Sequence, residues 1–301
     1  MKKLCLLVSS LVLSSLAYSA SADLKVVACE PEWGALTQEL GGDKVEVFNA
    51  TTALQDPHHI QARPSLIAKV RNADLVICTG AELEVGWLPI LLRQAGNAKV
   101  QPGNPGYLEA TQYVQLLEVP TVLSRGEGDV HAAGNPHIQT DPHNIALVGN
   151  ALAQRLAELD PPAAAYYQQR HDDFSARWQQ AMHRWEAQAA PLKGLPIVVH
   201  HKGWVYLNRW LGLREVAALE PKPGVSPSVA YLAEILSTLQ KQPAKVIIRT
   251  PYDDPRPSEY LTEQIKIPNI VLPGTVGGDA QAEDLFGLFE DTIHRLLEAT
   301  R

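Results

Sequence analysis

The sequence predicts an α/β protein of two lobes, each with a parallel sheet, joined by a long rigid helix. Before residue 100, short apolar segments alternate with helical segments across short connections, which is the pattern of a parallel sheet covered on both faces. The segment 163–190 contains neither Gly nor Pro, and the alternation resumes after Gly194. At 301 residues the chain is long enough for two domains of about 100–150 residues each.

The elements of the first lobe follow from its apolar patterns. Strands are expected at 24–29, 44–48 and 75–78, and helices at 33–40, 64–72 and 82–95. Gly41-Gly42, directly after the first of these helices, is the usual signal for a helix end. Between 102 and 134 the pattern is irregular, and we predict only an apolar run at 113–119.

The middle of the chain is predicted to be helical. Apolar residues recur at helical spacing from 144 to 159, and Asp160-Pro161-Pro162 then interrupts the pattern. A helix at 163–190 would be about 42 Å long, which suits a strut between two domains. The second lobe is expected to contain strands at 197–200, 213–218, 245–249 and 269–272, and helices at 204–211, 226–240, 257–265 and 282–300. We therefore divide the chain into 1–22, an N-terminal lobe at 23–142, linking helices at 143–193 and a C-terminal lobe at 194–301.

The first 22 residues have the pattern of an export signal. Lys2 and Lys3 precede an apolar segment at 4–16, and Ala20-Ser21-Ala22 offers a small-residue cleavage site. The apolar segment is too short to span a bilayer. Cys5 lies at the start of this segment rather than at a cleavage site, which argues against a lipid anchor. We expect an exported chain, cleaved near Ala22, with no other membrane segment.

Two cysteines, Cys29 and Cys78, remain after the export signal. An even number of cysteines in an oxidising compartment permits one disulfide, which would stabilise the fold by about 4 kcal/mol on the chain-entropy model. Two other interpretations stay open. The thiols could be small buried apolar side chains, or they could bind a metal ion.

Histidine is concentrated in three clusters that lie far apart in the chain. They are Asp56-Pro57-His58-His59, Asn135-Pro136-His137 and Val199-His200-His201, and each occurs where a predicted strand or turn gives way to a loop. One isolated histidine is most often a surface or capping residue, but three converging neutral imidazoles form a site for a borderline transition metal, zinc above all. The remaining histidines on predicted helices are interpreted as surface residues: His143, His171, His183 and His294.

Motifs along most of the chain resemble those of one protein family. In order, they are Gly41-Gly42-Asp43, Asp56-Pro57-His58, Pro64-Ser65, Ala73-Asp74-Leu75, Gly80-Ala81-Glu82-Leu83-Glu84, Trp87-Leu88, Asn135-Pro136-His137, Asp141-Pro142, His201-Lys202-Gly203-Trp204-Val205-Tyr206 and Leu211-Gly212-Leu213. Together they resemble the metal-binding solute receptors that supply zinc or manganese to bacterial ABC importers, the ZnuA/TroA-like family. The match covers nearly the whole chain after the export signal, which no single short motif could achieve.

The resemblance implies a metal-binding receptor rather than an enzyme. It implies that His58 and His137 from the first lobe and His201 from the second bind one ion in the cleft between the lobes. It further implies a periplasmic monomer that passes zinc, or less favourably manganese, to an ABC permease at the inner membrane. Only neutral imidazoles bind metal, so affinity should fall as pH drops through the range near 6.5.

The chain departs from the family where a fourth ligand is expected. Thr250 stands where members usually have a Glu at the end of a strand, and Leu272-Pro273-Gly274 replaces a turn that often contains Asp. Asp279, His59, His200 or a water molecule could take the fourth position, and Asp279 could equally be a helix N-cap. Without a carboxylate, the preference shifts from manganese toward zinc.

Other residues near the motifs are interpreted as supporting ones. His59 and His200 each neighbour a matched ligand, and adjacent residues of an extended segment point to opposite sides. We expect both to point away from the ion. Many zinc receptors of the family have a long acidic, histidine-rich loop, but this chain has only Glu127, Asp129 and His131 there, so secondary metal capture is not expected.

Competing functions are less well supported by the sequence. A zinc-dependent hydrolase would need a general base and a substrate pocket, and the chain has no H-E-x-x-H or similar pairing. An adhesin-type surface protein on the same fold is disfavoured by the missing lipid-anchor signal. The net charge of −7, without Lys/Arg runs, argues against a nucleic-acid partner.

Overall fold

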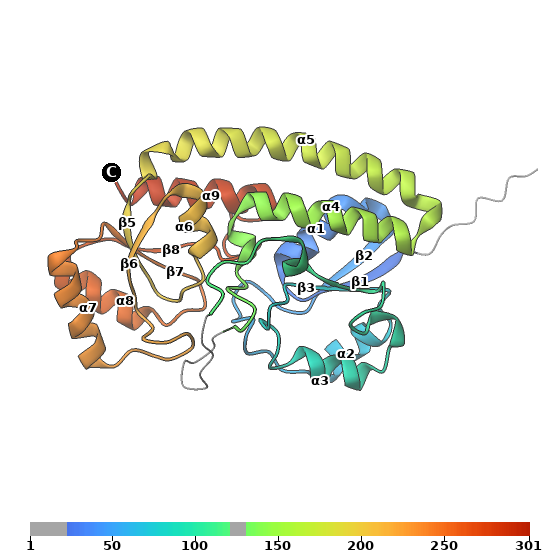
Figure 1. Ribbon diagram of the computed structural model, residues 1–301, viewed down its shortest axis with the longest axis horizontal. Helices are drawn as coiled ribbons and strands as arrows, with labels where there is room; N and C mark the ends of the chain where they lie inside the picture. The colour runs from blue at the N-terminus through green and yellow to red at the C-terminus, as the bar shows by residue number, and fades with distance from the viewer. Residues whose placement is uncertain (1–22, 121–130) are drawn as a thin grey trace, which may run out of the picture.

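The computed structural model describes residues 23–120 and 131–301, and it confirms the predicted architecture of two parallel-sheet lobes (Figure 1). The lobes lie side by side, and the long helix α5 (Ala164–Ala189) runs over both of them. The predicted export signal at 1–22 and the loop residues Glu127 and Asp129 lie outside the described residues. In the described parts of the chain, no helix is both long and apolar enough to cross a bilayer.

The N-terminal sheet has four parallel strands in the spatial order β2-β1-β3-β4. They are β1 (Leu24–Ala28), β2 (Val45–Asn49), β3 (Leu75–Cys78) and β4 (Tyr107–Glu109). The sequence did not predict β4, because three residues after the turn Asn104-Pro105-Gly106 are too few to show a period. The other strands agree with prediction to within one residue.

Alternate residues of this sheet face two different cores. Val27 and Val76 pack under α2 (Pro64–Arg71) and α3 (Leu88–Ala95) on one face. Val26 belongs to the core of the opposite face, which α1 (Pro31–Gly41) covers. The two-residue period of the strands thus places helices on both sides of the sheet.

The helix expected at 82–95 begins only at Leu88, so the prediction was wrong for 82–87. Gly80, Ala81 and Glu82 have φ values of 86°, 49° and 68°, which lie outside the right-handed helical region. Trp87 is buried, as the apolar periodicity indicated. The residues before the helix nevertheless form a tight turn that leads into it.

The C-terminal sheet repeats the arrangement of the first, with parallel strands in the order β6-β5-β7-β8. Its strands are β5 (Pro196–Val199), β6 (Arg214–Ala218), β7 (Val246–Arg249) and β8 (Asn269–Val271). The remaining helices are α4 (Pro142–Leu159), α6 (Val205–Leu211), α7 (Val229–Lys241), α8 (Pro255–Ile265) and α9 (Leu285–Glu298). Short 3₁₀ segments lie at Gly42–Lys44, Ala98–Val100, Ala110–Tyr113, Ile138–Thr140, Pro161–Ala163 and Ala190–Leu192.

One hydrophobic core extends beneath α5 through both lobes. It contains Val26 of the first sheet and Val199 of the second, together with residues of α1, α4 and α9. Trp178 of α5 stands at its centre, with its ring centroid 5.1 Å from that of Trp185 and 5.5 Å from that of Phe289 on α9. The helix expected as a strut is therefore also part of a cover shared by the two lobes.

A disulfide joins Cys29 and Cys78 in the structure. Cys29 directly follows β1 and Cys78 ends β3, and these strands are paired neighbours, so their Cα atoms are 4.7 Å apart. Both side chains are buried. The covalent link thus ties together the central strands of the N-terminal lobe.

Replacing Trp178 with Ala should lower the free energy of unfolding by about 3–5 kcal/mol, because the truncation leaves a cavity in the shared core. Urea denaturation followed by circular dichroism measures the change. His183→Ala, at an exposed position of the same helix, is the matched control and should change stability by less than about 0.5 kcal/mol. Equal effects of the two substitutions would show that α5 spans the lobes without stabilising them.

Candidate metal centre

Three histidines from separate parts of the chain meet between the two lobes. His58 lies in the loop after β2, His137 directly precedes the segment Ile138–Thr140, and His201 follows β5. One ring nitrogen from each lies within 4.8 Å of the other two. The ring centroids are 5.5 Å apart for His58 and His137, 5.5 Å for His58 and His201, and 5.1 Å for His137 and His201.

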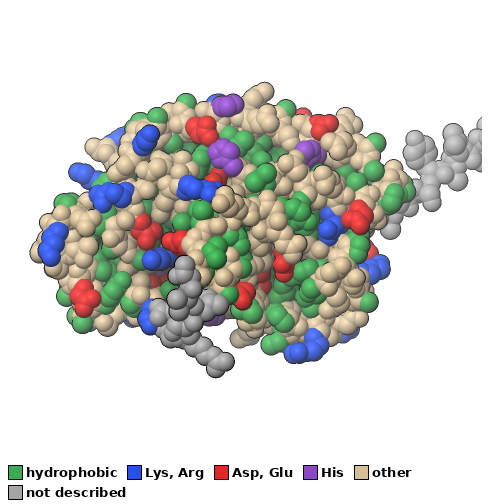
Figure 2. Space-filling model, viewed as in Figure 1, with side chains coloured by type: hydrophobic (Ala, Val, Ile, Leu, Met, Phe, Trp, Pro, Cys, Tyr) green, Lys and Arg blue, Asp and Glu red, His purple; other side chains and the backbone are tan. Residues whose placement is uncertain are grey.

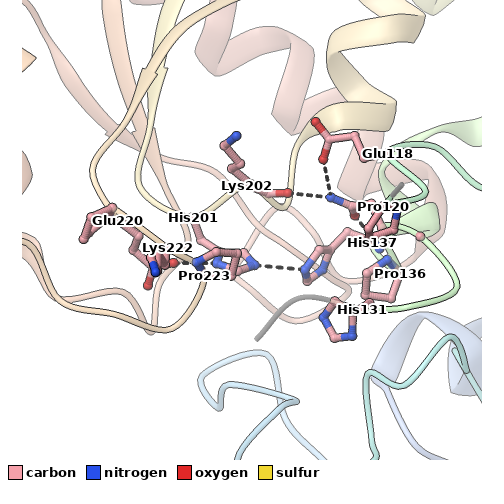
Figure 3. Close-up of a pocket in the computed structure, with 13 residues that line it drawn as sticks. Glu118, Pro120, His131, Pro136, His137, His201, Lys202, Glu220, Lys222 and Pro223 are labelled. Carbon is pink, nitrogen blue, oxygen red and sulfur yellow. Dashed lines mark hydrogen bonds and ion pairs between the residues drawn. The ribbon is translucent and has the colours of Figure 1, made fainter. Parts of the chain in front are cut away.

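The site opens into a cleft that both lobes line (Figure 3). Asn135 and His137 form the N-terminal side, and His201, Glu220 and Lys222 form the C-terminal side. The close-up shows the His137 and His201 rings pointing toward one another across this cleft. Only the folded arrangement of the two lobes therefore brings the ligand candidates together.

In the space-filling view, acidic and basic side chains are intermixed over the visible face of the molecule (Figure 2). Neither sign of charge forms a continuous field over the visible face. This agrees with the modest net charge of −7. The features that could select a ligand therefore lie inside the cleft rather than on the visible surface.

The Nδ1 atoms of two of these rings are held by carboxylates. The His58 Nδ1 lies 2.7 Å from Asp56 Oδ1, and the His201 Nδ1 lies 2.7 Å from Glu220 Oε2. A hydrogen bond of this kind fixes the tautomer, so that Nε2 is the nitrogen with a free lone pair. The His58 Nε2 is buried and has no hydrogen-bond partner among the described residues. A buried nitrogen without a partner is costly, which is the condition that a bound cation would relieve.

The spacing of the ring nitrogens suits a zinc ion. The Nε2 atoms of His137 and His201 lie 3.1 Å apart. Two nitrogens bound at about 2.0–2.1 Å in tetrahedral geometry would be roughly 3.3 Å apart. A cation between the two nitrogens would bind the lone pair of each ring in its neutral form.

The surroundings shift the pKa values of His137 and His201 in opposite directions. Burial lowers the pKa of His137 well below its ordinary value, and the nearby rings of His201 and His58 add to the effect. Burial also opposes the charged form of His201, but the hydrogen bond and charge of Glu220 outweigh it and raise its pKa. His137 is therefore ready to bind a cation, whereas His201 must release a proton first.

The motif residues around the histidines join the backbones of the two lobes by hydrogen bonds next to the site. Asn135 Oδ1 accepts from the His137 backbone N–H at 3.1 Å, and its Nδ2 donates to the Lys202 carbonyl at 2.8 Å. The Tyr206 hydroxyl donates to the Asn135 carbonyl at 2.7 Å. A side chain at Gly203 would crowd both rings, since a Cβ there would lie 3.3 Å from a ring carbon of His201 and 3.4 Å from one of His137. The shared motifs thus position backbone as much as they supply ligands.

The carboxylate of Asp279 is engaged in contacts with other parts of the chain. Its Oδ1 accepts from the backbone N–H groups of Gln281 and Ala282, each at 2.9 Å, and its Oδ2 lies 2.9 Å from Arg295 Nη2. Asp279 is therefore engaged in a turn and an ion pair, and it does not join the three-histidine group. Its backbone hydrogen bonds agree with the capping alternative, and its reach to the ion stays a prediction.

His59 and His200 also lie outside the group of three. The His59 side chain is 64% exposed, and its Nε2 lies 3.9 Å from Asp56 Oδ2. His200 is buried, and its Nδ1 has no hydrogen-bond partner in the described chain. The exposure of His59 is compatible with a side chain that points away from the ion, and the orientation of His200 stays a prediction.

The sequence interpretation missed two side chains that reach the site. Glu220, after β6, orients His201, but an acidic residue after a strand carries no signal by itself. His131 was interpreted as the remnant of a loop, yet its ring centroid lies 5.4 Å from that of His58. Its position six residues before His137 gave no indication of this approach.

Three carboxylates are buried behind His137. Glu30, Glu32 and Glu84 are all less than 4% exposed, and the first two line a small cavity with His137. Burial is the largest cause that raises the pKa of Glu32 and of Glu84 to about 7, and it raises the pKa of Glu30 well above the ordinary value. The Thr275 hydroxyl of the C-terminal lobe donates to Glu32, so this group also links the two lobes.

Comparison with known proteins identifies one family for this chain. The family model described as "Zinc-uptake complex component A periplasmic" matches residues 26–299. The manganese ABC transporter substrate-binding lipoprotein PsaA of Streptococcus pneumoniae is 23% identical over 257 residues, which are 83% of this chain and 79% of PsaA. The iron ABC transporter substrate-binding lipoprotein MtsA of Streptococcus pyogenes serotype M1 is 23% identical over 259 residues, covering 82% of this chain and 78% of MtsA.

Solved structures share the fold. A crystal structure of ZnuA superimposes with a TM-score of 0.77 at 20% identity, covering 93% of this chain and all of that one. A manganese-bound mutant of a periplasmic metal-binding protein from Candidatus Liberibacter asiaticus superimposes with a TM-score of 0.75 at 17% identity, covering 92% of this chain and 99% of that one. At such low identity, the likeness establishes the two-lobed architecture.

The buried carboxylates should make stability depend on pH in a defined direction. The pKa of Glu32 is about 7 in the folded protein and near 4.5 in an unfolded chain, so between these values the folded state keeps a proton that the unfolded state has lost. Ionisation of Glu32 therefore favours unfolding as pH rises from about 4.5 to about 7. Relative to the parent protein, Glu32→Gln should gain stability over this interval.

Urea denaturation at pH 5, 6, 7 and 8 measures this difference, with the exposed Glu259→Gln as the matched control. The control should show a constant difference from the parent. A Glu32→Gln difference that stays constant across the series would contradict the raised pKa.

Proposed function

This chain belongs to the family of metal-binding components of ABC importers typified by zinc-uptake component A, and from that premise we propose that it is a periplasmic zinc receptor. In this proposal the protein captures Zn²⁺ between its lobes and delivers it to an ABC permease of the inner membrane. His58, His137 and His201 are the proposed ligands. The observation that carries the proposal is the convergence of three ring nitrogens within 4.8 Å of one another.

Zinc is preferred over manganese because of the donor set. Relatives with the same architecture are named for manganese and for iron, so the family alone does not select the ion. Here the three converging donors are nitrogens, and Thr250 stands where a carboxylate is usual. The nearby carboxylates of Asp56 and Glu220 are engaged with Nδ1 atoms. Nitrogen donors favour zinc, whereas manganese prefers oxygen.

A receptor also explains the surroundings of the site better than a zinc-dependent hydrolase. A hydrolase needs a carboxylate or imidazole placed to take a proton from metal-bound water. Asp56 and Glu220, whose carboxylates contact the ligand rings, already accept from them. Their arrangement holds the rings in place, which a receptor requires.

Export to the periplasm remains part of the proposal. The family model is described as periplasmic, and the named relatives are lipoproteins. The pattern at 1–22 supports export with cleavage near Ala22, and a monomer would suffice because both sides of the cleft come from one chain.

His137→Ala should weaken zinc binding by well over tenfold while the protein stays folded, because the change removes one of three ligands from the site. Competition with a chelator of known affinity measures binding, and circular dichroism checks the fold. His294→Ala, on the exposed side of α9, is the control and should bind as the parent does. An unchanged affinity of His137→Ala would remove this residue from the site.

Zinc affinity should fall as pH is lowered, and the fall should begin above the ordinary histidine pKa of about 6.5. Because the pKa of His201 is raised, the ion should displace a proton from this ring at a higher pH than from an ordinary histidine. Affinity should then fall by about tenfold per pH unit for each displaced proton. Chelator competition from pH 5.5 to 8 measures the profile.

Glu220→Gln provides the matched comparison for the pH profile. It removes the charge that raises the pKa of His201, so the loss of affinity should begin at lower pH than in the parent. Coincident profiles of the two proteins would show that His201 does not control the proton release.

A further inference from the structure

We propose that His131 supplies a fourth nitrogen ligand to the bound ion. The inference rests on the proposed zinc site and adds a residue that neither the motifs nor the three-histidine group contains. Zinc in proteins is commonly four-coordinate, so three histidines leave one position to fill. The side chain that fills it must have a donor atom near the cleft that is not already engaged.

Four carboxylates of the described chain do not meet this condition. Asp56 and Glu220 accept hydrogen bonds from the ligand rings through Nδ1. Asp279 is bound to a turn and to Arg295. Asp253, after β7, accepts from the Thr250 backbone N–H at 2.7 Å. Each has a structural task that a metal bond would disturb.

His131 has the donor that these residues lack. Its Nε2 is buried and has no hydrogen-bond partner in the described chain, which is the condition also found for the Nε2 of His58. The backbone of Glu82 and Ala81 lies near the ring and acts on its pKa as a hydrogen-bond acceptor would, raising it. As with the Asp56 bond to His58, an acceptor on one side of the ring leaves the other nitrogen available to an ion.

The backbone that holds His131 is shaped for this contact. Gly80, Ala81 and Glu82 are three successive residues with positive φ, a conformation that Ala and Glu rarely adopt. The Glu82 carboxylate accepts from the Ala132 backbone N–H at 2.6 Å, so the turn also fixes the residue after His131. Such strain persists where the surrounding structure enforces it, and it is concentrated at ligand sites.

The distance between His131 and one of the proposed ligands, His58, is similar to the distances among the ligands. The His131 and His58 ring centroids are 5.4 Å apart, against 5.1–5.5 Å among the three proposed ligands. Figure 3 shows His131 beside His137, on the lining of the same cleft. Its ring nitrogen is not within 4.8 Å of all the others. We therefore expect a rotation of the His131 side chain toward the ion on binding.

A fourth imidazole would also decide the selectivity of the site. Manganese-type sites complete their coordination with carboxylate oxygen, whereas four nitrogens form a site for zinc and other borderline metals. His131 would then make up for the absence of a carboxylate at Thr250. The cost of losing it should accordingly be larger for zinc than for manganese.

The first test compares zinc affinities of the parent, His131→Ala, His137→Ala and the control His294→Ala by chelator competition. His131→Ala should bind zinc roughly tenfold or more weakly, since even the hydrogen-bond partners of ligands are typically worth 10–100-fold. Parent-like affinity of His131→Ala with weakened His137→Ala would overturn the role of His131 alone. Parent-like affinity of both variants would overturn the zinc site itself.

A second test separates ligation from a mere change in the loop. X-ray absorption of the zinc-loaded proteins counts the imidazoles bound to the ion. Four are expected in the parent and in His294→Ala, and three in His131→Ala. The same count in the parent and His131→Ala would overturn the proposal, even if the affinities differ.

Discussion

The site depends on one constraint, the apolar core that α5 closes over both sheets. Trp178 and its aromatic neighbours join α5 to α9, while α1 and α4 bring the first sheet into the same core. Because the two sheets share one packed cover, the loops at their carboxyl ends face each other across a defined cleft. His58 follows β2 and His201 follows β5, as ligands do at the carboxyl ends of parallel strands. A small change in core packing would therefore change the distance between the ring nitrogens.

Hydrogen bonds at Nδ1 determine which ring nitrogen of His58 and of His201 is available to an ion. Asp56 and Glu220 each hold a ring by this atom, so both rings present Nε2 to the cleft. The same bonds explain the opposite behaviour of two rings at similar depth. Burial lowers the pKa of His137, which has no carboxylate among the causes of its shift, whereas Glu220 raises that of His201. The number of protons displaced by an ion is thus set by the residues behind the ligands.

The sequence predicted much of this molecule because local patterns determine most of its elements. Apolar strands and helices between turn residues located both sheets, and the motifs around His58, His137 and His201 indicated residues that the structure brings together. It failed where tertiary contacts override the pattern. The segment 82–87 follows a helical apolar period but begins in the left-handed turn at Gly80–Glu82, and β4 is too short to have a period. His131 and Glu220 reach the site only through folding, so no spacing in the chain could indicate them.

The carboxylates explain how a neutral donor set can hold a dication in a largely buried place. Imidazoles supply lone pairs but no charge, and an uncompensated charge in such surroundings is costly. Asp56 and Glu220 place two negative charges one hydrogen bond away from the proposed ligand rings, which would balance the charge of a divalent ion without occupying its coordination positions. Direct carboxylate ligands would supply the same charge but would add oxygen donors that suit manganese. Because the carboxylates are hydrogen-bonded to the far side of the rings, the atoms bound to the ion would all be nitrogens. The positive charge of the ion would still be balanced.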